Sequence, residues 1–234
     1  MLGLPGSGFT LTKDGRVDAS GALSLSTPVA YGLGNNRFVL GGASLSNSLR
    51  PRFPETGKND DLNRGGNGTA QFLYGISLKQ AGTLTPAIVF LSGHGDTVFN
   101  LQYTAPPVGN GDVTYAIGVL DIAGSGGASG QGQPSDGDST TSFYGVATYT
   151  APKYDAHISL GIGSRRYEGL FGNASMTVIP NVKGYLEYDT FNVNGGVGWS
   201  IPMPSKSSGN QLGLVLQVGV VRGKYLSTSI NFSF

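Results

Sequence analysis

The chain has 234 residues, only 12% of them charged, and a formal net charge of +1 at pH 7. It contains no cysteine, which excludes a disulfide framework and thiolate metal sites. The near-neutral charge argues against a nucleic-acid-binding protein, which needs a basic face. No apolar run of about 18 residues is present, so the sequence predicts no transmembrane helix.

Short stretches of alternating apolar and polar residues recur along the whole chain, and no long amphipathic helix is indicated. A period of two is typical of a strand with one apolar and one polar face. Phe9 and Leu11 alternate with threonines ahead of Asp14–Gly15, a strong hairpin signal. In chain order, the expected strands include those near residues 7–13, 21–31, 37–46, 69–80, 84–92, 97–105, 113–122, 156–163, 183–189, 193–201, 211–220 and 225–234.

The last stretch alternates almost perfectly and ends on an aromatic residue. Its apolar positions are Leu226, Thr228, Ile230, Phe232 and Phe234, and the positions between them are polar apart from Tyr225. This stretch resembles the last strand of bacterial outer-membrane β-barrels. That resemblance implies that the barrel-insertion machinery reads the end of the chain at Phe234.

A soluble antiparallel sandwich also alternates, but two features favour a membrane barrel. The polar face carries Gly, Ser, Asn and Gln rather than Lys and Glu, as a confined lumen requires. The apolar face carries aromatic residues near strand ends, which form girdles at the two lipid interfaces of such barrels. These residues are Tyr74, Tyr103, Tyr188, Trp199 and Phe234.

The sequence therefore predicts an all-β fold: one transmembrane antiparallel up-and-down β-barrel over residues 1–234. We count about fourteen strands, or twelve if one of the short ones is not real. No basic segment followed by an apolar core opens the chain. Because an exported protein needs a signal peptide, we expect this sequence to be a mature or recombinant form.

Two long polar segments, 48–67 and 123–140, are loops by composition. Four expected strands separate them, and an even number places both loops at one end of the barrel. Bacterial barrels have long outer loops and short inner turns, which makes this the extracellular end. The short links at 151–154 and 180–181 then fall at the opposite end.

Charged residues on the lumen face, together with His157, are the main candidates for a functional site. They are Lys79, Asp121, His157, Arg165, Lys183, Glu187 and Asp189. Charges in a lumen tune which solutes pass. Charges of mixed sign also pair across the lumen and hold its shape, and the sequence leaves both interpretations open.

No catalytic, metal or cofactor site is indicated. The chain has two histidines, and neither belongs to a metal-binding pattern. His94 lies in a Gly-rich stretch that we interpret as a solvated turn, although a pairing of His94 with Asp96 in a membrane hydrolase is the competing hypothesis. His157 is better explained as a paired lumen residue than as a catalyst.

Residues 169–172, Pro180, 184–189 and 192–197 resemble a short repeat of the YjbH-type outer-membrane barrels. Those barrels are linked to exopolysaccharide production. The resemblance implies a barrel and a connection with polysaccharide export.

We therefore expect an outer-membrane channel that lets small hydrophilic solutes diffuse through a water-filled lumen, with the two long loops partly gating its mouth. Fourteen strands lie between filled barrels of about eight and open porins of 16–18. The expected partners are outer-membrane lipids, lipopolysaccharide and the insertion machinery. The alternative is a non-conducting structural or interaction barrel with a plugged lumen, linked to exopolysaccharide export or assembly.

Overall fold

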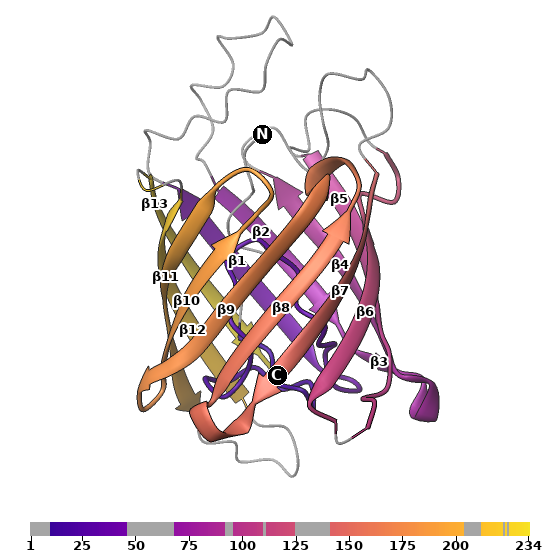
Figure 1. Cartoon of the computed structure of the whole chain (residues 1–234). Helices are drawn as coiled ribbons and strands as arrows, with labels where there is room; N and C mark the ends of the chain where they lie inside the picture. The colour runs from indigo at the N-terminus through magenta and orange to yellow at the C-terminus, as the bar shows by residue number, and fades with distance from the viewer. Residues whose placement is uncertain are drawn as a thin grey trace, which may run out of the picture.

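The computed structural model describes residues 10–45, 68–91, 96–109, 111–124, 141–203, 212–221, 223 and 225–234. They form one antiparallel sheet that closes into a barrel (Figure 1). Its strands are β1 (Phe38–Leu45), β2 (Gly68–Tyr74), β3 (Ile76–Ser77), β4 (Thr83–Leu91), β5 (Asp96–Thr104), β6 (Val113–Leu120), β7 (Ser142–Ala151), β8 (Ala156–Gly163), β9 (Gly169–Ile179), β10 (Val182–Tyr188), β11 (Val193–Met203), β12 (Leu212–Val221) and β13 (Tyr225–Ser233).

Each strand from β4 to β13 pairs with the next one along the chain. The ring closes because β1 pairs with both β13 and β2, and β2 pairs with β4. Twelve strands thus form the wall, and the two-residue β3 adds a short extension beside β4. Closure removes the exposed strand edges that an open sheet would present.

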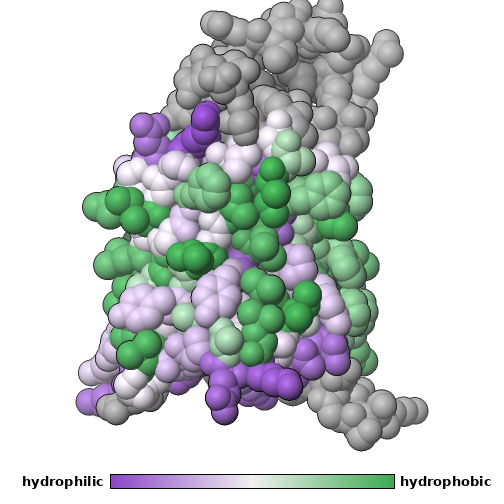
Figure 2. All heavy atoms as spheres, turned by 90° about the vertical axis from the view of Figure 1, so that its right-hand side faces the viewer, coloured by the Kyte–Doolittle hydropathy of each residue, from purple (hydrophilic) through white to green (hydrophobic). Residues whose placement is uncertain are grey.

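The alternation in the sequence sets the two faces of the wall. In β8, the side chain of Leu160 is 68% exposed, whereas that of its neighbour Ser159 is fully buried. In β13, Leu226, Ile230 and Phe232 are exposed, and the serines and asparagine between them are buried. Figure 2 shows the resulting hydrophobic side chains over the middle of the barrel, with hydrophilic residues gathered toward its ends.

The barrel has two different ends. The turn end carries the short links after β7 and β9, including the 3-10 turn η6 (Pro152–Tyr154), together with the C-terminus (Figure 1). The opposite end, here the loop end, receives the strands that flank the expected loops. Those loops, 48–67 and nearly all of 123–140, lie outside the described residues.

The aromatic residues expected at lipid interfaces all lie on the outer wall. Phe234 and Tyr74 each stack on Phe38 at the turn end, where the chain's first and last strands meet. Tyr103 and Trp199 lie in the half of the barrel nearer the turn end, and Tyr188 is exposed at the loop end.

The structure has twelve wall strands because residues 10–34, here the lumen segment, lie inside the barrel (Figure 1). Strands were expected at 7–13 and 21–31. Of the first, residues 7–9 lie outside the described residues, and the rest forms a single bridge between Leu11 and Ala22. The second is not a strand, so the count of fourteen is wrong and the alternative of twelve is confirmed.

Backbone pairing explains this difference. A wall strand needs carbonyl partners on both neighbours, but the lumen segment takes its partners from side chains. The amides of Leu23, Ala30 and Leu33 donate to the hydroxyls of Ser175, Thr148 and Thr85 on the inner wall. Side chains on β4, β7 and β9 therefore accept hydrogen bonds that the backbone carbonyls of a neighbouring strand would otherwise accept.

No helix in the described part of the chain is long and apolar enough to cross a bilayer.

Candidate functional site

The lumen segment leaves the barrel for β1 at the turn end, and its Asp14–Gly15 turn lies beside that exit. The Asp14–Gly15 hairpin signal is a real turn, in which Gly15 N donates to Thr12 O at 2.9 Å. Gly15 has φ +77°, and a Cβ there would lie 2.0 Å from the nitrogen of Gly34, so only glycine fits between the two limbs. The segment then rises to an apex at residues 25–27 and returns to β1.

Glu187 on β10 holds the apex. Its carboxylate accepts the backbone N–H groups of Leu25, Ser26 and Thr27 at 2.9, 3.1 and 3.2 Å. The hydroxyls of Ser26 and Thr27 donate to it at 2.7 and 3.0 Å, and Asn194 Nδ2 donates at 3.0 Å. Six donors thus replace the water shell of a carboxylate that is only 2% exposed.

The 3-10 turn η7 (Arg165–Tyr167) folds over the apex at the loop end. Tyr167 Oη donates to the carbonyl of Ser26 at 2.8 Å. Arg166 is buried beside Asp189, with 3.8 Å between its Nη2 and the carboxylate, and its guanidinium lies over the Tyr167 ring. The Asp189 carboxylate also accepts Asn194 Nδ2 and the amide of Asn192. This ion pair is therefore built into the loop end of the wall.

His157 on β8 joins the two limbs near the turn end. Its Nε2 lies 2.9 Å from the carbonyl of Ser20 on the rising limb, and its Nδ1 lies 3.2 Å from Tyr31 Oη on the returning limb. Both ring nitrogens therefore contact the lumen segment. Below it, the buried ammonium of Lys183 lies 3.4 Å from Asp155.

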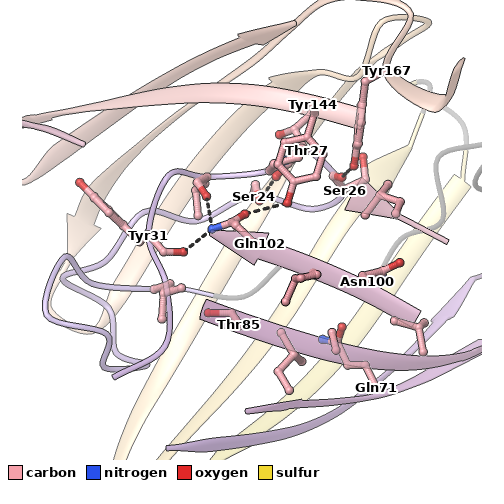
Figure 3. A pocket seen from close by; sticks show the side chains of 18 residues that line it. Ser24, Ser26, Thr27, Tyr31, Gln71, Thr85, Asn100, Gln102, Tyr144 and Tyr167 are labelled. Carbon is pink, nitrogen blue, oxygen red and sulfur yellow. Dashed lines mark hydrogen bonds between the residues drawn. The ribbon is translucent and has the colours of Figure 1, made fainter. Parts of the chain in front are cut away.

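The wall formed by β2 to β7 faces the segment differently. Gln102 Nε2 donates to the carbonyls of Tyr31 and Val29 at 2.8 and 3.2 Å, and its Oε1 accepts Tyr144 Oη at 2.8 Å (Figure 3). Beside these contacts, a cavity of about 120 Å³ separates the segment from the wall. The segment is thus bound tightly to the side of β8–β10 and more loosely to the opposite side.

The structure places four of the seven expected lumen residues, His157, Lys183, Glu187 and Asp189, deep inside the barrel wall. Asp121 is buried at the loop end, just after β6. Lys79 is exposed in the 3-10 turn η2 (Lys79–Ala81) outside the lumen, because the wall strand ends at Tyr74. Arg165 is half-buried in η7, and its neighbour Arg166 takes the inner position.

Sequence reasoning missed Ser26 and Thr27 as the partners of Glu187, and it placed Arg166 at a strand end without recognising Asp189 as its partner. One signal was available: residues 21–33 combine consecutive Ser and Thr with apolar residues on both parities, which fits a segment buried on all sides better than a wall strand. His94 lies outside the described residues. Within them, no three His, Cys, Asp or Glu residues gather closely enough to hold a metal ion.

No protein-family model and no curated protein matches the chain in sequence. Its structure is similar to a solved KdgM porin, with a TM-score of 0.53 and 9% identity over 85% of this chain and 98% of that one. The chain has a porin-type β-barrel fold. A solved COG4313 outer membrane channel from Pseudomonas putida F1 matches with a TM-score of 0.38 and 10% identity over 88% of this chain and 98% of that one.

Proposed function

We propose that this porin-type barrel is an outer-membrane channel for passive diffusion of small hydrophilic solutes, and that it conducts when the apex of the lumen segment leaves Glu187. The observation that carries the proposal is the polarity of the wall behind the segment. Small hydroxyl and amide side chains line it, among them Thr114, Thr148, Ser159, Asn173, Asn194 and Gln217. Water can satisfy these groups as well as the segment does.

The way in which the segment is held supports a movable closure. Its apex is attached through hydrogen bonds to the Glu187 carboxylate, each typically worth roughly 1.5–3 kcal/mol net, and water can occupy the same groups once the apex leaves. Within the described residues, the segment continues covalently into the wall through β1, and its apex is held by side chains and not by strand pairing. The apex can therefore swing aside without any wall strand unpairing.

The outer membrane is the proposed location. The exposed apolar outer wall suits acyl chains, and the alternating β13 with Phe234 at its end suits recognition by the insertion machinery. Lipids and lipopolysaccharide are the proposed surroundings. In this orientation, the loop end faces the exterior.

A non-conducting structural or interaction barrel is the second candidate, and one specific observation favours it. The lumen segment is buried over most of its length, including Leu23, Leu25 and Leu33. A permanently filled barrel would present only its ends to a partner such as an exported polysaccharide.

A cross-link separates the two candidates. Because the chain has no cysteine, the double variant Ala30→Cys/Thr148→Cys carries only the two thiols to be joined by oxidation; the Ala30 amide lies 2.8 Å from Thr148 Oγ1. In planar lipid bilayers, we expect discrete current steps from the reduced protein. The oxidised protein should give almost none, because the returning limb is then fixed to β7.

The matched control is Leu33→Cys/Thr85→Cys, where the Leu33 amide lies 3.1 Å from Thr85 Oγ1. This disulfide fixes only the base of the segment, next to its junction with β1, and should leave most of the conductance. Silence of the folded, reduced protein under all voltages would reject the channel in favour of the structural barrel. Equal conductance of the reduced and the oxidised Ala30→Cys/Thr148→Cys protein would reject the movable segment.

A further inference from the structure

We infer that the cavity between the lumen segment and the wall of β2–β7 is a binding site for a small uncharged solute that combines an apolar body with hydroxyl or amide groups. The inference deepens the proposed function by naming the solute class that the lumen receives. Binding to this site does not require that the barrel conducts.

The lining of the cavity is mixed in character. Leu73, Ala87 and Val89 supply an apolar floor on β2 and β4. The hydroxyl of Thr85 and the amides of Gln71 and Asn100 reach it from the same wall, and the rings of Tyr144 and Tyr167 close one end (Figure 3). A ligand site of this kind is typically apolar with a few polar groups that fix orientation.

No charged side chain lines the cavity among the described residues. An ionised solute entering it would lose its water shell without gaining a counter-charge, which is costly in a confined space. The Glu187 carboxylate lies behind Ser26 and Thr27, with its oxygens already occupied by six donors. Among the buried charges, Glu187 thus holds the segment from behind, and its carboxylate is not part of the cavity lining.

Hydrogen bonds within the protein fix the shape of the cavity. The Gln102 side chain contacts the segment with its nitrogen and Tyr144 with its oxygen. The cavity therefore has a defined shape when the barrel is closed. A volume of about 120 Å³ is slightly below the roughly 150 Å³ cavity that holds benzene, so the site suits a ligand of about six heavy atoms.

Four probes of nearly equal size test the solute class: 1,4-butanediol, glycerol, 4-hydroxybutyrate and protonated 4-aminobutanol. Binding to the full chain in detergent is measured by saturation-transfer NMR with titration. We expect saturable binding of butanediol and weaker binding of glycerol, which lacks the apolar body. The anion and the cation should bind about tenfold or more weakly, because their charges find no partner.

Substitutions at two alanines, one lining the cavity and one on the outer face of the wall, locate the binding. Ala87 lines the cavity on β4, so Ala87→Phe should fill it and abolish butanediol saturation, and the smaller change Ala87→Leu should weaken it. Ala147 lies on the outer face of β7, and Ala147→Phe should bind butanediol as the unmodified protein does while adding the same bulk.

Equal binding of the charged probes, or butanediol binding that survives both Ala87 variants in folded protein, would overturn this inference and leave the conductance result untouched. Conversely, a barrel that binds butanediol but never gives current steps would keep the site and reject the channel. The two proposals therefore fail by different measurements.

Discussion

A single carboxylate makes most of the hydrogen bonds that hold the apex of the lumen segment. Glu187 accepts three consecutive backbone amides of the lumen segment, two hydroxyls and one side-chain amide. Bonds to an ionised acceptor are roughly twice as strong as neutral ones. The charge of Glu187, more than any apolar contact, therefore determines how firmly the apex is held.

Replacing Glu187 by glutamine keeps the shape and removes the charge. Bonds to the remaining oxygen become neutral ones, and the donors that met the replaced oxygen face an NH2 group that cannot accept, at a cost on the order of 1–3 kcal/mol. We expect the open population in planar bilayers to rise about tenfold. The open barrel should also lose preference for cations, measured as the reversal potential in a salt gradient, because Glu187 faces the lumen when the apex leaves.

Glu168→Gln is the control, since Glu168 is an exposed acid at the same end of the barrel. It should change neither the open population nor the reversal potential. If Glu168→Gln changes the open population as much as Glu187→Gln does, the change comes from losing one negative charge at this end of the barrel, and Glu187 does not hold the apex.

At the scale of the strand, the sequence predicts most of what the structure shows. The alternation in β13 gives its faces residue by residue, from Leu226 outward to Ser233 inward. The same rule fails for residues 21–31, because periodicity reports which side chains are buried and not what the backbone pairs with. The hydrogen bonds to Ser175 and Thr148 join residues that are far apart in the chain, so no local sequence pattern predicts them.

Two adjacent glycines in β1, the strand that pairs with β13 to close the ring, differ in how much room they leave for a side chain. Gly41 faces inward beneath the bridge from Gln71 Nε2 to Asn231 Oδ1, and a Cβ there would lie 1.9 Å from that oxygen. Gly42 faces outward, where the nearest atom to a Cβ, the carbonyl oxygen of Thr69, lies at 3.4 Å. Only the first position is too close for a methyl group.

We therefore expect Gly41→Ala to destabilise the barrel by about 1–3 kcal/mol through overpacking and loss of the amide bridge. Gly42→Ala should be almost neutral. The measurement is the temperature at which the folded band disappears on SDS gels. A Gly41→Ala barrel as heat-resistant as Gly42→Ala would show that β1 can shift to make room.

At the scale of the molecule, composition and alternation predict a closed barrel with an apolar exterior, but they do not predict what fills it. The lumen charge Glu187 was visible in the sequence, and the segment that meets it lies about 160 residues away in the chain. Contacts between such distant residues depend on the closed ring. The open or filled state of the lumen is therefore a property of the whole molecule.

Orientation is the remaining property at this scale, and exposed positions at the two ends allow a direct test. Glu168 is exposed at the loop end, and Lys153 is exposed in η6 at the turn end. With no native cysteine, single variants Glu168→Cys and Lys153→Cys each carry one thiol.

In intact Gram-negative cells that display the barrel, a membrane-impermeant maleimide should label only the first, because long loops face outward in such barrels. Disruption of the outer membrane should then make both thiols reactive. Labelling of Lys153→Cys alone in intact cells would invert the assignment, placing the C-terminus outside and opposing recognition of Phe234 from the periplasmic side.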